Sequence, residues 1–288
     1  MEKVLNGKAI YSPKGKAGEY AKYACNFYVG CSNDCDYCYC KRGILGHAMG
    51  APKATLKKCF KDERDALEVF RKELVANLEE LRKHGLFLTF TSDPFLPETR
   101  NITIEAVGMA VSYWVPCKIL TKRADFIDYL PGEWFINPNY RDRIAFGFTL
   151  TGHDELEPGA STNAERINAM RNLHNAGFKT FASIEPIVTL FESEMMITMT
   201  LDCCDLYKIG LMSGKRPYSR DEVTLFCSRV DAMIAKRNSF VPLPSDKPYN
   251  KPKVYWKDSV LEYIGMDRES ICICMFHVGA DYNIFKDG

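Results

Sequence analysis

The chain has 288 residues, of which 46% are hydrophobic and 26% charged, and its formal net charge is +1. This length can bury a large core without disulfides, in one large α/β domain or two smaller ones. The near-neutral charge gives no bulk electrostatic reason to expect a nucleic-acid or membrane partner. Residues 1–20 lack the apolar stretch of a signal peptide, and no apolar run reaches the roughly 18 to 20 residues of a membrane span. We therefore expect a cytoplasmic protein without a membrane partner, whose twelve cysteines are thiols or metal ligands.

Short apolar segments, bounded by turn formers or charged residues, alternate along the chain with amphipathic helical patterns. The expected strands cover residues 23–29, 86–90, 118–121, 144–150, 179–185 and 205–210. Apolar residues at helical spacing predict a helix over residues 62–84, ended by Gly85. Capping-box patterns at residues 162–165 and 219–222 predict two further helix starts. This alternation favours a parallel sheet, and six such units suit a partial (β/α)6 TIM-type barrel over residues 1–240. The proline-rich residues 241–253 predict a linker into a C-terminal extension, residues 241–288.

The loop 30–40, GCSNDCDYCYC, follows the first expected strand, and chemistry in such a barrel belongs at the C-terminal strand ends. Cys31, Cys35 and Cys38 have the spacing C-x3-C-x2-C. Three thiolates on one loop can hold three irons of a [4Fe-4S] cluster and leave the fourth open for a ligand such as S-adenosylmethionine. The alternatives are a structural zinc site with Cys40 as fourth ligand, or core cysteines. One crowded loop is unusual for zinc, and the intervening residues are polar.

This spacing, with the aromatic Tyr37 before the third cysteine, resembles the signature of the radical S-adenosylmethionine (radical SAM) superfamily. Segments 26–43, 90–99, 119–125 and 148–188 resemble its spore photoproduct lyase-like, or DNA repair photolyase-like, subgroup. The resemblance implies reductive cleavage of S-adenosylmethionine at a [4Fe-4S] cluster, and a 5'-deoxyadenosyl radical that abstracts hydrogen from a substrate. It also implies an electron donor such as flavodoxin or ferredoxin.

The resemblance further implies which residues contact the cofactor. The methionyl amino group would meet the end of the second strand, and Lys122 would bind the carboxylate. The end of the fourth strand would contact the ribose or the carboxylate, and the end of the fifth strand the ribose or the substrate. Adenine would meet the residues around the third cysteine, and Glu185 would take a catalytic role that stays unassigned. The remaining expected contacts are Tyr37, Tyr39, Thr91, Ser92, Asp93, Thr149, Thr151 and Ser183. The plain alternatives are ordinary strand residues, a turn cap at Asp93 and a solvated Lys122.

The substrate is less defined by the sequence. Spore photoproduct lyases carry a hydrogen-donating cysteine where this chain has Phe90, which puts that repair reaction in doubt. The subgroup resemblance implies a nucleic acid or nucleotide as the expected substrate, and the alternative is a small molecule or peptide. A non-catalytic zinc protein is the remote alternative. Aromatic and basic residues interleaved around Tyr218 and Tyr255–Lys257 can stack bases, or can be ordinary rim residues.

A second metal site is the last candidate. Its ligands would be Cys203, Cys204, Cys272 and Cys274, for an auxiliary cluster or a zinc ion. The alternation over residues 271–276 instead favours a half-buried strand, in which cysteine acts as a small hydrophobic residue.

Overall fold

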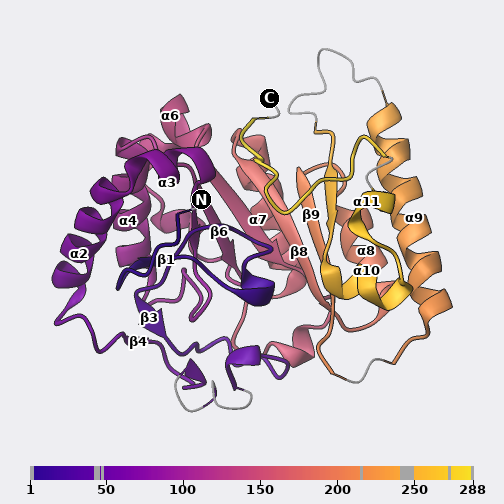
Figure 1. Cartoon of the computed structure of the whole chain (residues 1–288), viewed down its shortest axis with the longest axis horizontal. Coiled ribbons are helices and arrows are strands. Elements are labelled where there is room, and N and C mark those ends of the chain that lie inside the picture. Colours follow the sequence, from indigo (N-terminus) through magenta and orange to yellow (C-terminus); the bar gives the residue numbers. More distant parts are fainter. Residues whose placement is uncertain are drawn as a thin grey trace.

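A computed structural model describes residues 3–41, 46, 49–214, 217–240, 250–271 and 274–286. Within them the fold is mixed α/β, built on an eight-stranded sheet in the order β1-β2-β5-β6-β7-β8-β9-β10 (Figure 1). Every neighbouring pair is parallel except the edge pair β1–β2. The strands are β1 (Ile10–Tyr11), β2 (Ala24–Cys25), β5 (Leu86–Leu88), β6 (Cys117–Thr121), β7 (Ile144–Thr149), β8 (Lys179–Ile187), β9 (Leu206–Leu211) and β10 (Lys253–Trp256).

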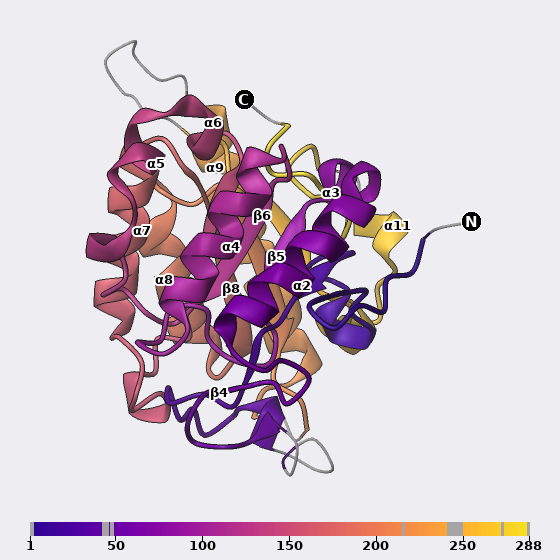
Figure 2. The ribbon, with the colours of Figure 1, turned by 90° about the vertical axis from the view of Figure 1, so that its left-hand side faces the viewer.

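The longer helices lie along one face of the sheet, from α2 and α4 on one side to α8 and α9 on the other (Figures 1 and 2). None of the described helices is long and apolar enough to cross a bilayer. Their bounds are α2 (Glu63–Ala76), α3 (Leu78–His84), α4 (Arg100–Ser112), α5 (Gly132–Ile136), α6 (Pro138–Arg141), α7 (Asn163–Asn175), α8 (Leu190–Thr200), α9 (Arg220–Ser239), α10 (Asp258–Ile264) and α11 (Arg268–Ile271).

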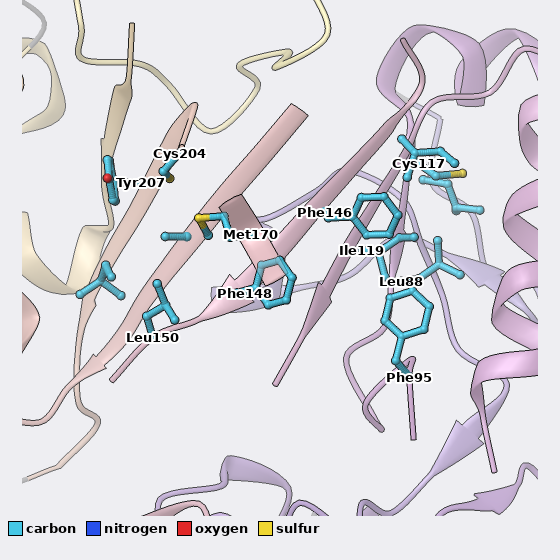
Figure 3. Packing of buried hydrophobic residues seen from close by; sticks show 14 of the residues in the cluster. Leu88, Phe95, Cys117, Ile119, Phe146, Phe148, Leu150, Met170, Cys204 and Tyr207 are labelled. Atoms are coloured by element: carbon cyan, nitrogen blue, oxygen red, sulfur yellow. The ribbon is translucent and has the colours of Figure 1, made fainter. Parts of the chain in front are cut away.

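The two faces of the sheet bury different parts of the chain. Figure 3 shows the larger core between helices and sheet, where Phe146 and Ile119 lie close to Leu88. The opposite face packs against the segment before β2 and the C-terminal residues 278–286, through Tyr20 and Ile284. Successive side chains along each strand point alternately to these two faces. Chain termini therefore fill the side of the sheet that the helices leave uncovered.

Five of the six expected strands match observed strands to within two residues at each end. Both capping boxes are present, with Thr162 starting α7 and Ser219 starting α9. The strand predicted over residues 23–29 is wrong in its second half. There Asn26 leaves the ladder, and its Oδ1 accepts a hydrogen bond from the Phe90 N–H at 2.8 Å. β3 (Tyr28–Val29) then pairs with β4 (Thr55–Leu56) in a separate two-stranded sheet.

Two other predicted elements differ from the structure. The helix expected over residues 62–84 is broken at Asn77, whose side-chain amide donates to the Glu73 carbonyl at 2.7 Å and competes with the helical pattern. The strand expected over residues 271–276 is also wrong where the chain is described, since Ile271 ends α11 and residues 274–276 form a bend and turn. Residues 272 and 273 lie outside the described part.

The C-terminal residues extend the same sheet. β10 pairs in parallel with β9, so part of the predicted extension continues the sheet. Residues 241–249 of the predicted linker lie outside the described part of the chain.

Candidate functional site

The cysteine loop follows β3 and is folded tightly on itself. At its start Gly30 has φ +82°, and a Cβ there would meet the Lys53 carbonyl oxygen at 2.4 Å. The Cys31 N–H donates to the Ala51 carbonyl at 3.0 Å, and the Cys38 N–H to the Cys35 carbonyl at 3.2 Å. Cys35 is buried, whereas Cys31 and Cys38 are half-buried. The loop therefore holds three thiols on one short turn.

The thiols of this loop differ in acidity. Burial, with the nearby Asp93 carboxylate, raises the pKa of Cys31 to about 12. Burial also raises the pKa of Cys35, where Cys38 and Asp93 add smaller effects. A hydrogen bond from Cys40 is the main cause that lowers the pKa of Cys38 to about 6. The hydrogen bond from Cys40 therefore favours the thiolate form of Cys38.

The cysteine thiols are suitable metal ligands by residue type, but their arrangement in the structure does not form a metal site. Cys35 affects the pKa of Cys31, and Cys38 affects that of Cys35, so consecutive cysteines of the loop lie near each other, and thiolates suit iron–sulfur clusters. In the described part of the chain, however, no three or more His, Cys, Asp or Glu side chains gather closely enough to hold a metal ion. The three cysteines are therefore suitable ligands for an iron–sulfur cluster, and the loop would have to change conformation to bring their thiols around it.

Asp93 ties the cysteine loop to two strand ends. Its Oδ2 accepts from the Asn33 side-chain amide and from the Lys122 N–H, both at 2.8 Å. Its Oδ1 accepts from the Thr121 hydroxyl at 2.6 Å and the Phe95 N–H at 3.0 Å. Four donors saturate this buried carboxylate. Asp93 thus caps the turn after β5, as the alternative predicted, and also positions the loop.

A second anchor for the loop was not found from the sequence. The Tyr37 hydroxyl donates to Glu157, which forms an ion pair with Arg166, and the side chains of both charged residues are fully buried. Arg166 also donates to the Thr149 carbonyl at 2.6 Å. The only available signal was that Glu157 and Arg166 lie in a segment of the family resemblance. This pair links α7, the end of β7 and the cysteine loop.

The loop that carries Glu157 packs directly on the cysteine loop. The Asp36 N–H donates to the Leu156 carbonyl at 3.0 Å, and the Gly159 N–H to the Asn33 carbonyl at 3.1 Å. A Cβ on Gly159 would lie 2.0 Å from the Ser32 carbonyl oxygen. Glycine is therefore required for this approach.

Lys122 lies next to Tyr37 of the cysteine loop. Its Nζ lies 5.5 Å from the centre of the Tyr37 ring. Burial lowers the pKa of Lys122, but Cys35 and Glu157 raise it, and the net direction is upward. Lys122 is therefore an ammonium group held against the cysteine loop.

The other residues expected near the second strand lie beside these anchors. The Thr91 hydroxyl donates to the Tyr28 carbonyl at 2.5 Å, and the Tyr39 hydroxyl to the Phe90 carbonyl. The buried Ser92 Oγ and Asn33 Oδ1 have no hydrogen-bond partner within the described residues. Ser92 lines a small pocket together with Asp93. Two unpartnered acceptors next to Asp93 suit a ligand that donates hydrogen bonds.

Ser183 and Glu185 belong to a separate group around Tyr20. The Tyr20 hydroxyl lies 2.6 Å from Ser183 Oγ and 2.7 Å from Glu185 Oε2, which Lys257 Nζ also contacts at 2.7 Å. Thr149 and Thr151 are buried at the end of β7, and the Thr151 hydroxyl accepts from the His153 N–H at 3.2 Å. The structure thus divides the expected site into a cysteine-loop group and this second group.

Phe90 lies between the two groups. Its ring stacks on Phe87 with centroids 4.5 Å apart and meets Tyr20 edge-on at 6.1 Å. The position that holds a cysteine in the lyases is therefore packed with aromatic rings.

Two other sequence-based candidates gain no support. Tyr218, Tyr255, Trp256 and Lys257 are buried, so they form no base-stacking surface. Cys203 and Cys204 lie in the hydrophobic core, where Figure 3 shows Cys204 near Tyr207, and Cys272 lies outside the described residues.

Comparison with known proteins gives distant similarities. No family model matches the chain. The uncharacterized protein MJ0683 of Methanocaldococcus jannaschii is 24% identical over 204 residues, 68% of this chain and 72% of that protein. SuiB of Streptococcus suis is 10% identical, with a TM-score of 0.47 over 70% of this chain and 46% of SuiB. Its complex with S-adenosylmethionine gives a TM-score of 0.42 over 58% of this chain and 41% of SuiB. The chain thus spans less than half of SuiB, and these similarities assign no family.

Proposed function

We propose that this protein is a radical SAM enzyme of the spore photoproduct lyase-like subgroup, with its parallel sheet as the partial (β/α)6 barrel of that superfamily. Cys31, Cys35 and Cys38 would hold a [4Fe-4S] cluster. When bound, the cluster would supply the electron that cleaves S-adenosylmethionine into methionine and a 5'-deoxyadenosyl radical, which abstracts hydrogen from the substrate. The observation that carries the proposal is the C-x3-C-x2-C loop clamped between the Asp93 and Glu157 anchors at the C-terminal strand ends.

The surrounding side chains support S-adenosylmethionine as the ligand. Lys122 is a half-buried cation just after the end of β6, suited to the methionyl carboxylate. Ser92 Oγ and Asn33 Oδ1, near Asp93, have no hydrogen-bond partner among the described residues and are suited to the amino group. Tyr37 presents a ring fixed at its hydroxyl by Glu157. The cysteine loop is thus surrounded by a cation for the carboxylate, hydrogen-bond acceptors for the amino group and an aromatic ring.

A zinc site with Cys40 as fourth ligand fits less well. The Cys40 Sγ lies 3.8 Å from the Phe90 carbonyl oxygen, and a hydrogen bond between the Cys40 and Cys38 side chains lowers the pKa of Cys38. Its role in the structure is to support Cys38.

Variants at Cys35 and Cys40 test the proposal. After anaerobic purification, the protein should contain about four iron and four sulfide per chain, as the formula of a [4Fe-4S] cluster requires. Cys35→Ala should lose iron and its brown absorbance, whereas Cys40→Ala, the matched control on the same loop, should keep both. Stoichiometric zinc that is lost in both variants would show a four-cysteine zinc site instead.

For the substrate, we propose a nucleic acid or nucleotide, with a small molecule or peptide as the alternative. The subgroup resemblance supports the first. Affinity for single- and double-stranded DNA that falls steeply with salt is expected. Negligible affinity at low salt would leave the alternative. We further propose a flavodoxin or ferredoxin as the electron donor, since the radical chemistry requires one-electron reduction.

A further inference from the structure

Two lysines converge on one backbone carbonyl, on the sheet face that the helices leave uncovered. Lys118 in β6 and Lys208 in β9 donate to the Tyr20 carbonyl at 3.2 Å and 3.4 Å. Their nitrogen atoms are therefore at most about 6.6 Å apart, the sum of these two distances. Lys208 is 5% exposed and Lys118 is half-buried, so the pair is open to solvent only on the Lys118 side.

The acidic side chains nearby are already paired with a third lysine. Lys257 Nζ contacts Glu185 at 2.7 Å and Glu19 at 3.1 Å. No ion pair within the described part of the chain involves Lys118 or Lys208, so Glu19 and Glu185 are paired with Lys257 alone. When all three lysines are protonated, the cluster of Lys118, Lys208 and Lys257 lacks one negative charge.

A buried cation without a counter-ion is unfavourable. Burial accordingly lowers the pKa of Lys118 to about 8, and burial and the other two lysines lower the pKa of Lys208. An anion placed between the two nitrogens would supply the missing charge. Ser183, the partner of Lys208 in the β8–β9 register, offers a hydroxyl beside it.

We propose that Lys118 and Lys208 bind a phosphate group of the substrate, next to Tyr20 and Ser183. Calling the ligand a substrate rests on the proposed function, whereas the anion site itself rests on the charges and contacts above. Lysine binds phosphate as a point charge, which suits two convergent ammonium groups with no fixed fork geometry. The site accounts for a buried and a half-buried lysine that pair with no carboxylate among the described residues.

Phosphate binding to the full-length protein tests this inference. Inorganic phosphate is titrated at pH 7 by calorimetry into the wild type, Lys118→Met and Lys208→Met, with Lys179→Met in β8 as the matched control. Methionine keeps the side-chain length and removes a buried charge, so the fold should be retained. We expect saturable binding in the wild type and the control, and at least tenfold weaker binding in the other two. Absence of saturable binding in the wild type, or equal binding by all four proteins, overturns the proposal.

Further titrations identify the source of the phosphate. A deoxynucleoside monophosphate that binds more tightly than inorganic phosphate supports a nucleotide substrate, and equal affinity supports a free phosphate. Binding of acetate but not phosphate contradicts the proposal. These titrations need no cluster, and Lys208→Met should contain as much iron as the wild type. A protein without iron whose phosphate binding still depends on Lys208 would refute the proposed function alone.

Discussion

Replacing Arg166 by methionine would leave the Glu157 carboxylate buried without its cation. Both side chains are fully buried in the ion pair, and Arg166 also donates to the Thr149 carbonyl at 2.6 Å. Removing one partner of a buried ion pair costs about 3–5 kcal/mol. This is a large part of the roughly 5–15 kcal/mol that stabilises a typical folded protein. We expect Arg166→Met to lower the free energy of unfolding by about this amount.

Chemical denaturation followed by circular dichroism measures the effect. Arg171→Met is the matched control on the same helix, because Arg171 pairs with the exposed Asp202 at 3.3 Å. An exposed pair contributes about 0–1 kcal/mol. The double variant Glu157→Gln with Arg166→Met should be less destabilised than the single Arg166 variant, since no buried charge is left unpaired. A cost for Arg166→Met below about 1 kcal/mol would refute the idea that this pair anchors the cysteine loop.

Three further predictions concern the loop and the sheet interior. In metal-free protein at pH 7, iodoacetamide should alkylate Cys38 before Cys31, because the pKa of Cys38 is about 6 and that of Cys31 about 12. Mass spectrometry measures the order of alkylation, and the reverse order would contradict the preference for a thiolate at Cys38. Lys118 has a folded pKa of about 8 against roughly 10.4 when unfolded, so the unfolded chain binds more protons between these values and stability should rise with pH across that window. Denaturation midpoints compared with Lys118→Met isolate this contribution, and equal pH slopes would exclude it. Gly159→Ala should displace the cysteine loop and lower the iron content, because its Cβ would lie 2.0 Å from the Ser32 carbonyl oxygen. Gly108→Ala in α4 is the control, since its Cβ would meet nothing within 4 Å. Equal iron content in both variants would argue against close packing of the Gly159 loop on the cysteine loop.

The sequence predicts the sheet well where local pattern and tertiary position agree. β7 is buried along its whole length, and its apolar run is visible in the sequence. The first strand is different, because Asn26 uses its side chain to bind the Phe90 backbone and ends the ladder early. Such a long-range hydrogen bond has no local signature.

In the candidate site, too, the sequence predicts residues that a local pattern marks and misses those that long-range contacts bring in. Loop spacing identifies Cys31, Cys35 and Cys38 as neighbours, and strand ends identify Asp93 and Lys122. Partners brought in by the fold stay hidden. Glu157 lies 120 residues from Tyr37, and Lys257 lies 72 residues from Glu185. Charged residues in a sequence are usually solvated, so nothing marks these as buried.

The most direct test of the central claim is the cleavage of S-adenosylmethionine. The protein is reconstituted anaerobically with iron and sulfide, reduced with dithionite and incubated with S-adenosylmethionine, and 5'-deoxyadenosine is measured by mass spectrometry. The proposed function predicts 5'-deoxyadenosine from the wild type and none from Cys35→Ala. Wild-type protein that is loaded with iron and sulfide but forms no more 5'-deoxyadenosine than Cys35→Ala would contradict it.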